Sequence, residues 1–243
     1  MLLSAKNAKG RMKRKFNHKL MHKDHYPFFE RVFYRPIASL ITPLVASLGI
    51  QPTMMNFFNF VVGLLGVYLI AFGDYKTSVL GALILIISYI FDCVDGQLAR
   101  GLGKENKFGA LIDTTLDSIK ESLIFIALGW RYFSITAEPK IGYYVLAILF
   151  GQRMLGRTIP WYRLIFRESV EEVKEAFIKD TRPFLKIIGT VFSESYRSGT
   201  IWIIIFISVL HKQIPLVFIY FIVVIYSLWL ALLVNGYQRG RNG

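Results

Sequence analysis

The chain of 243 residues is 54% hydrophobic and 15% aromatic, which is too apolar for an ordinary soluble domain and typical of an integral membrane protein. Its formal net charge of +13 suits anionic lipid head groups or anionic substrates, and so apolar a chain argues against a nucleic-acid-binding module. The single cysteine, Cys93, excludes a disulfide within the chain and a cysteine-based zinc site.

Residues 1–49 are predicted to form a basic cytoplasmic arm followed by a helix at the membrane interface. Residues 1–26 are rich in lysine and arginine, which suits a segment close to anionic lipids. Over residues 28–48 the apolar side chains recur every three or four positions, the spacing of an amphipathic interfacial helix. Pro36 and Pro43 are expected to break or kink this helix.

Residues 50–243 are predicted to form a membrane domain of six transmembrane helices, so the expected fold class is all-α integral membrane. The predicted spans are residues 54–73, 78–95, 109–130, 141–159, 197–210 and 214–235, each a largely apolar run. Lysine and arginine gather before the first span, in alternate connections and in the tail. Because such residues accumulate on the cytoplasmic side, both termini are expected to be cytoplasmic.

Four aspartates lie where the second span ends and the third begins. Asp92 and Asp95 are three positions apart and share one helix face, while Asp113 and Asp117 are four apart on the next helix. Where two such faces meet, the carboxylates surround one point. Oxygen ligands without cysteine or histidine favour Mg²⁺, Mn²⁺ or Ca²⁺, and a pair of such ions can clamp the oxygens of a transferring phosphoryl group. The sequence therefore predicts phosphoryl chemistry at a membrane surface.

The residues from Asp92 to Asp117 also match the pattern D-x2-D-G-x2-A-R-x8-G-x3-D-x3-D without a gap or substitution. This pattern resembles the signature of the CDP-alcohol phosphatidyltransferases. The resemblance implies that Asp92, Asp95 and Asp113 bind two divalent ions, Mg²⁺ or Mn²⁺. It also implies that Asp117 completes the metal site and acts as the general base for the acceptor hydroxyl. The residues that it assigns to the CDP part of the donor are Asp92, Gly96, Ala99, Arg100 and Gly109.

The reaction implied by the resemblance belongs to phospholipid biosynthesis. A phosphatidyl, or other substituted phosphoryl, group passes from a CDP-linked donor such as CDP-diacylglycerol to the hydroxyl of a small alcohol, and CMP leaves. The resemblance further implies a homodimer with a cytoplasmic active site, in the plasma (inner) membrane if the source is prokaryotic. Many family members read Pro-Asn-x-x-Thr before the first span, whereas this chain has Pro52, Thr53 and Asn56, so the amide and hydroxyl are exchanged.

Three arginines near the ends of later spans are candidate residues for binding the acceptor: Arg153, Arg157 and Arg197. They are predicted to bind the phosphate of a phosphorylated acceptor, inositol-1-phosphate or glycerol-3-phosphate, because a guanidinium matches phosphate geometry. Alternatively they only anchor helix ends among head groups, and the acceptor is serine, inositol, choline or ethanolamine. A carboxylate-based ion or proton transporter is a further alternative, although it would place its acids near mid-membrane within repeated halves.

Overall fold

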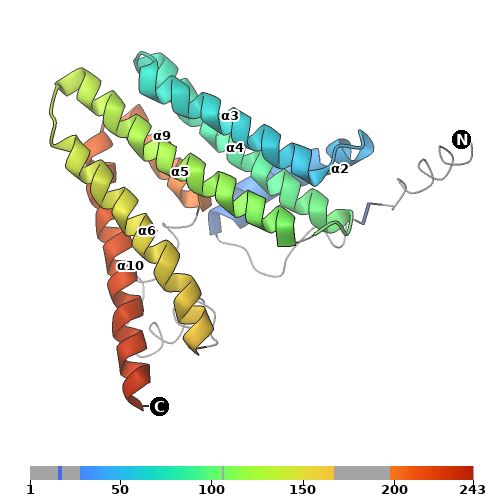
Figure 1. Cartoon of the computed structure of the whole chain (residues 1–243). Coiled ribbons are helices and arrows are strands. Elements are labelled where there is room, and N and C mark those ends of the chain that lie inside the picture. Colours follow the sequence, from blue (N-terminus) through green and yellow to red (C-terminus); the bar gives the residue numbers. More distant parts are fainter. Residues whose placement is uncertain (1–15, 18–27, 106, 167–197, 243) are drawn as a thin grey trace, which may run out of the picture. The chain divides into compact units, whose positions relative to one another are not determined.

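The computed structural model describes residues 16–17, 28–105, 107–166 and 198–242, and all regular secondary structure in these ranges is helical (Figure 1). The prediction of an all-helical fold is therefore confirmed for the described residues. The elements, in chain order, are η2 (Glu30–Tyr34), α2 (Arg35–Ser47), α3 (Pro52–Phe72), α4 (Tyr75–Gly101), α5 (Lys107–Thr136), α6 (Ile141–Phe166), α9 (Ser198–Leu210) and α10 (Ile214–Asn242).

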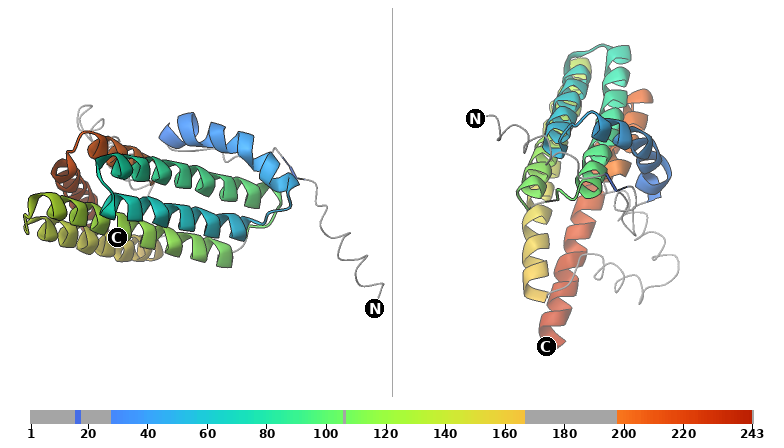
Figure 2. Two further views of the ribbon diagram at one scale, coloured as in Figure 1. Left: turned by 90° about the horizontal axis from the view of Figure 1, so that it is seen from above. Right: turned by 90° about the vertical axis from the view of Figure 1, so that its right-hand side faces the viewer.

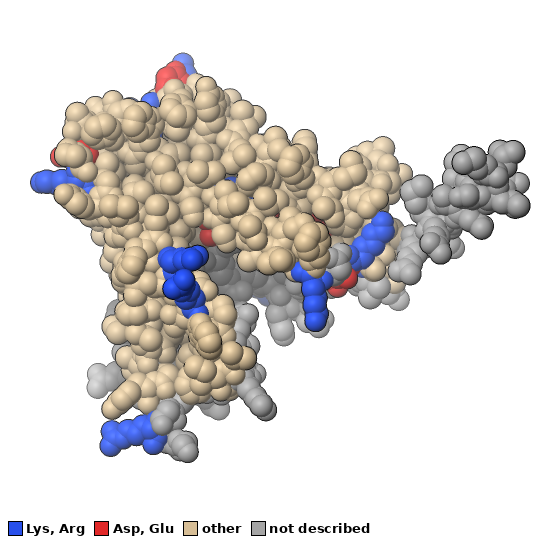
Figure 3. Space-filling model, in the orientation of Figure 1, with Lys and Arg blue, Asp and Glu red and all other residues tan. Residues whose placement is uncertain are grey.

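Among the residues that the structure describes, three helical segments are long and apolar enough to cross a membrane: Pro52–Phe72, Tyr75–Gly101 and Ile214–Val234. Figure 3 shows a broad uncharged surface over α3, which contains no charged residue. Helix α5 has 30 residues and α6 has 26, lengths that span a bilayer at 1.5 Å per residue, but both are more polar. The protein is thus an integral membrane protein, and the count of six spans stays a prediction.

The region of the predicted N-terminal interfacial helix is helical, as η2 followed by α2. Neither proline breaks it. Pro36 lies at the start of α2, just after the π-helical turn η2, and the helix continues past Pro43 to Ser47. Gly49, at a φ of +73°, then ends this segment in the left-handed conformation that glycine adopts without strain. The position of this helix at the membrane interface stays a prediction.

Helices α3 and α4 form a hairpin, because only Gly73 and Asp74 separate them. The Asp74 side chain begins α4, since its Oδ1 accepts a hydrogen bond from the Thr77 backbone N–H at 2.8 Å. Hydrogen bonds from the side chain and backbone of Thr77 lower the pKa of Asp74. The short turn and this cap fix where α4 starts, and so which of its residues face α3.

The described chain divides into two compact units, each considered by itself. The first contains η2, α2, α3 up to Leu64, α4 from Ile87, and α5 up to Ile119. In this unit α2 packs beside α4 (Figure 2), and the contact is polar and buried. Thr42 Oγ1 donates to Gln97 Oε1 at 2.8 Å, and Gln97 Nε2 donates to Ser39 Oγ at 3.2 Å. Gln97 lies inside the aspartate motif, so α2 is attached directly to the motif helix.

The second unit contains the remaining halves of α3 and α4 together with the rest of α5, α6, α9 and α10. Here α3 and α4 cross closely, since a Cβ added at Gly66 would lie 2.8 Å from the Gly81 carbonyl oxygen. Helices α6 and α10 lie side by side (Figure 1), joined by a hydrogen bond of 3.1 Å from Trp229 Nε1 to Thr158 Oγ1. Small residues and a few hydrogen bonds therefore hold the apolar helices together.

Candidate active site

Three of the four predicted aspartates converge. Asp92 and Asp95 from α4 and Asp113 from α5 each offer a carboxylate oxygen, and these oxygens all lie within 4.8 Å of one another. Asp95 is buried, and the other two are half-buried. The convergence of the two helix faces, inferred from residue spacing, is confirmed for these carboxylates, which we call the aspartate triad.

Asp117 lies one turn further along α5 and is half-buried. It is not among the three carboxylates that approach one another within 4.8 Å in the described part of the chain. One turn of helix advances the backbone by about 5.4 Å, so a residue one turn beyond Asp113 need not reach the point where the triad meets. The metal-binding and general-base roles of Asp117 stay predictions.

The chemistry of the triad fits a divalent cation. Its ligand atoms are all oxygens, the donors that Mg²⁺, Mn²⁺ and Ca²⁺ prefer over the sulfur and nitrogen favoured by zinc. Three carboxylates so close together repel one another when ionised, and in partly buried surroundings that repulsion is weakly screened. A divalent cation would remove this cost.

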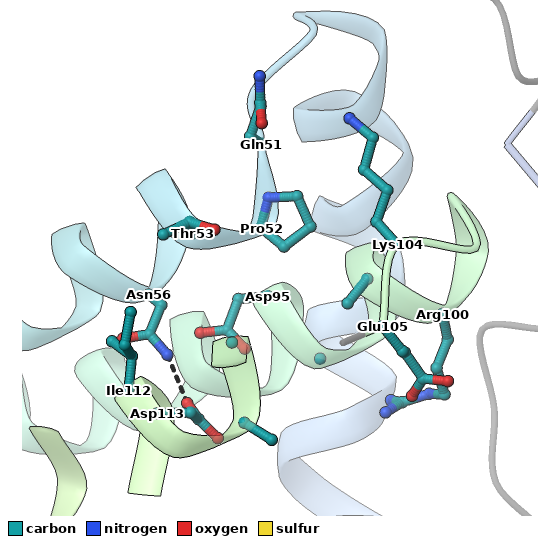
Figure 4. Close-up of a pocket in the computed structure, with 14 residues that line it drawn as sticks. Gln51, Pro52, Thr53, Asn56, Asp95, Arg100, Lys104, Glu105, Ile112 and Asp113 are labelled. Carbon is teal, nitrogen blue, oxygen red and sulfur yellow. Dashed lines mark hydrogen bonds between the residues drawn. The ribbon is translucent and has the colours of Figure 1, made fainter. Parts of the chain in front are cut away.

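Two asparagines of α3 contact the triad. Asn59 Nδ2 donates to Asp92 Oδ1 at 3.0 Å, and Asn56 Nδ2 donates to Asp113 Oδ1 in the contact dashed in Figure 4. Sequence reasoning noted Asn56 only as part of an exchanged turn pattern and missed Asn59. The available signal was a lone amide in the apolar run Phe57–Phe58–Asn59–Phe60, since a buried polar residue needs a partner.

A pocket of about 570 Å³ opens beside the triad within the first unit (Figure 4). Asp95 and Asp113 line it together with Asn56. Four of the five residues predicted to bind CDP also line it, namely Gly96, Ala99, Arg100 and Gly109, whereas Asp92 is not among the lining residues. The motif thus supplies both the carboxylates and most of one wall of the pocket.

Arg100 belongs to the pocket wall. Figure 4 shows it beside Glu105, on the opposite side of the pocket from Asp113. Its Nη1 lies 3.4 Å from where a Cβ would stand on Gly96, and Arg35 Nη1 lies 3.9 Å from the same point. Two guanidinium groups therefore lie within ordinary van der Waals distance of a Cβ at Gly96.

The predicted acceptor arginines are in a different part of the chain. Arg153 and Arg157 are exposed on α6 in the second unit, one turn apart. Arg197 lies outside the described residues. The acceptor-phosphate pocket therefore stays a prediction.

Comparison with known proteins agrees with the motif. The sequence model of the family described as CDP-alcohol phosphatidyltransferase matches residues 50–234, which is most of the chain and includes the whole triad. The chain belongs to the CDP-alcohol phosphatidyltransferase family. The resemblance inferred from the motif is confirmed.

Several curated relatives of this chain carry specific names. An archaetidylinositol phosphate synthase of Pyrococcus horikoshii is 35% identical over 106 residues, which are 42% of this chain and 55% of the relative. A phosphatidylinositol phosphate synthase of Mycobacterium tuberculosis is 29% identical over 104 residues, 43% of this chain and 47% of the relative. A bifunctional IPC transferase and DIPP synthase of Archaeoglobus fulgidus is 25% identical over 186 residues, 74% of this chain and 36% of the relative. The chain spans about half the length of the first curated relatives it matches.

Proposed function

We propose that this phosphatidyltransferase moves a phosphatidyl, or other substituted phosphoryl, group from a CDP-linked donor to the hydroxyl of a small phosphorylated alcohol and releases CMP. The observation that carries the proposal is the convergence of Asp92, Asp95 and Asp113 beside a pocket lined by the small motif residues. The names of two relatives, archaetidylinositol phosphate synthase and phosphatidylinositol phosphate synthase, favour inositol-1-phosphate over glycerol-3-phosphate as the acceptor.

In the proposed reaction the triad and Asp117 would hold two divalent ions, Mg²⁺ or Mn²⁺. When bound, such ions neutralise the diphosphate of the donor and stabilise the departing CMP. Gly96, Ala99, Arg100 and Gly109 would receive the CDP portion, the glycines by letting the nucleotide approach the backbone.

The proton transfer is assigned to Asp117. A bond forms between the acceptor hydroxyl oxygen and the phosphorus of the donor, while the bond from that phosphorus to the CMP oxygen breaks. The hydroxyl proton passes to the Asp117 carboxylate, which later returns it to solvent, and CMP keeps the electrons of the broken bond. A carboxylate on the same helix as Asp113 is well placed in sequence for this role, one turn from a metal ligand.

Arg153, Arg157 and Arg197 are proposed to bind the acceptor phosphate. Support comes from the exposure of Arg153 and Arg157 on one stretch of α6, which leaves their guanidinium groups accessible to an anion. Family membership supports the enzyme over the carboxylate-based transporter. The distribution of arginine and lysine supports six spans with both termini and the active site on the cytoplasmic side. We further propose a homodimer, in the plasma (inner) membrane if the source is prokaryotic.

The test is CMP release by the purified full-length protein with Mg²⁺ or Mn²⁺. The donors are CDP-diacylglycerol and the CDP-linked donor of an archaetidyl group. The acceptors are inositol-1-phosphate, glycerol-3-phosphate, inositol and serine. We expect release with inositol-1-phosphate and none without an acceptor. Release only with an unphosphorylated acceptor would refute the arginine pocket and keep the transfer chemistry, whereas silence with every pair of substrates would refute the proposed function.

A further inference from the structure

Helix α3 presents two buried amides toward the aspartate triad. Asn56 is 8% exposed and Asn59 is 2% exposed, although α3 is otherwise almost entirely apolar. Residues three positions apart lie on the same side of a helix, so both amides leave α3 in a similar direction. Buried amides of this kind are stable only when their donors and acceptors are used.

The orientation of the Asn59 amide is fixed by Ser88. The Ser88 hydroxyl, which is fully buried in α4, lies 2.6 Å from Asn59 Oδ1 and 3.0 Å from the Asn59 backbone oxygen. A hydroxyl that donates to the amide oxygen leaves the NH₂ group to face Asp92, whose ionised carboxylate only accepts. Ser88, Asn59 and Asp92 therefore form one directed chain of hydrogen bonds, in which each donor has a defined acceptor.

Asn56 makes the corresponding hydrogen bond to the aspartate of α5, the second helix that carries the triad. Its Nδ2 donates to Asp113 Oδ1 in α5, so α3 contacts a carboxylate of each helix that carries the triad. Position 56 is where many family members have the threonine of Pro-Asn-x-x-Thr, and an amide there reaches further and carries two donor hydrogens. Both contacts use a neutral donor, which leaves the negative charge of the triad intact, whereas a lysine or arginine would compete with a cation for it.

We propose that Asn59 is a positioning residue: through the chain from Ser88 to Asp92 it orients a carboxylate of the triad for a divalent cation, and Asn56 orients Asp113 in the same way. The inference rests on the proposed function in one respect, that the triad holds such a cation. Partners that orient metal ligands typically change metal affinity 10–100-fold when they are removed, so the effect is large enough to measure.

The decisive variant is Asn59→Leu, which keeps the size of the side chain and removes its donor. Asn56 also lines the pocket, so its replacement would mix substrate contacts with positioning, whereas Asn59 does not line it. Ser88→Ala removes the hydrogen bond from Ser88 to Asn59 Oδ1 and so tests whether Ser88 orients the Asn59 amide. Ser78→Ala is the matched control, because Ser78 is also a buried serine of α4 whose hydroxyl contacts a carbonyl of α3, that of Ile70 at 3.4 Å.

The measurement is Mn²⁺ titration of the purified full-length protein without substrate, followed by the paramagnetic resonance signal of free Mn²⁺. We expect the half-saturating Mn²⁺ concentration to rise about 10-fold in Asn59→Leu, less and in the same direction in Ser88→Ala, and not in Ser78→Ala. CMP release by Asn59→Leu should recover toward the wild-type rate as the Mn²⁺ concentration is raised, since the variant lowers only the fraction of triads that hold Mn²⁺. A purely structural role would lower the melting temperature and leave the Mn²⁺ midpoint unchanged.

A wild-type Mn²⁺ midpoint in Asn59→Leu would overturn the inference, as would an equal shift in Ser78→Ala. If Asn59→Leu does not fold, an unchanged midpoint in Ser88→Ala overturns it instead. The two proposals fail separately: wild-type protein that binds Mn²⁺ without releasing CMP refutes the transferase function and leaves the titration valid. Wild-type protein that binds no Mn²⁺ refutes the positioning role.

Discussion

Replacing Gly81 with alanine would place a methyl group against the backbone of the neighbouring helix. The new Cβ would stand 2.7 Å from the Gly66 carbonyl oxygen, 2.9 Å from Leu69 Cβ and 3.0 Å from the Ile70 backbone nitrogen. Ordinary van der Waals contact begins near 3.4 Å. None of these atoms is the end of a flexible side chain, so α3 and α4 would have to move apart locally by roughly 0.7 Å, against the low compressibility of a packed interior.

The expected cost follows from two opposing effects. Overpacking of this kind typically costs about 1–3 kcal/mol, while the better helix propensity of alanine returns at most about 1 kcal/mol. With that gain of about 1 kcal/mol subtracted, we expect Gly81→Ala to reduce the free energy of unfolding by up to about 2 kcal/mol. Gly156→Ala in α6 is the control, because a Cβ there meets nothing within 4 Å and only the propensity effect operates.

The assay is reversible denaturant unfolding of the two variants and the wild type in the same detergent, followed by tryptophan fluorescence and circular dichroism. Gly81→Ala should unfold at lower denaturant concentration than the wild type, and Gly156→Ala at the same or a higher one. If Gly81→Ala were as stable as Gly156→Ala, the close crossing of α3 and α4 would not hold and the reasoning would be refuted.

Three further predictions concern the site and the surface. Asp117→Asn should abolish CMP release and weaken Mn²⁺ binding, because Asp117 is proposed both as the general base and as a ligand that completes the metal site; Mn²⁺ binding at the wild-type level with lost release would leave Asp117 only the base role. Arg153→Ala should raise the KM for inositol-1-phosphate about tenfold or more, since a charge-assisted bond to phosphate is lost, and an unchanged KM in folded protein would remove Arg153 from the acceptor site. Asp74→Ala should lower the melting temperature at neutral pH. Because hydrogen bonds from Thr77 lower the pKa of Asp74, its stabilisation is present above the ordinary carboxyl pKa of 3.8 and lost as the pH falls through the lowered value. The difference between the two proteins should therefore shrink in acid, and a constant difference from pH 7 to pH 3 would exclude the charged cap.

The helices and the pairing of the aspartates were accessible from sequence because both depend on local periodicity. A long apolar run satisfies its backbone only as a helix in a membrane, and residues three or four apart must share a face. Those two rules predicted that Asp92 and Asp95 share one helix face, and that this face converges with the face that carries Asp113. They do not fix the angle at which two helices cross, and for that reason spacing could not decide whether Asp117 joins the triad.

The contacts of Asn59 were not accessible, since periodicity identifies a face and not the side chain that meets it. The same limit applies to Gln97, whose position inside the motif gives no indication that it bonds to Thr42 of α2. The prolines were expected to break or kink the N-terminal helix. The helix continues past both of them, with a π-helical turn just before Pro36 whose position the sequence pattern does not indicate.

The two-residue turn between α3 and α4 has a consequence for how the protein is made. Helices joined so tightly pair as soon as both have emerged from the ribosome and entered the bilayer, and the bond from Asn59 to Asp92 lies wholly within that pair. Asp92 would thus have a hydrogen-bond donor at the moment of insertion, when an unaccompanied carboxylate is most costly. Asp113 is translated later and arrives with α5, where Asn56 is already in place to receive it. The acidic centre would then be assembled one helix at a time on a prepared surface of α3.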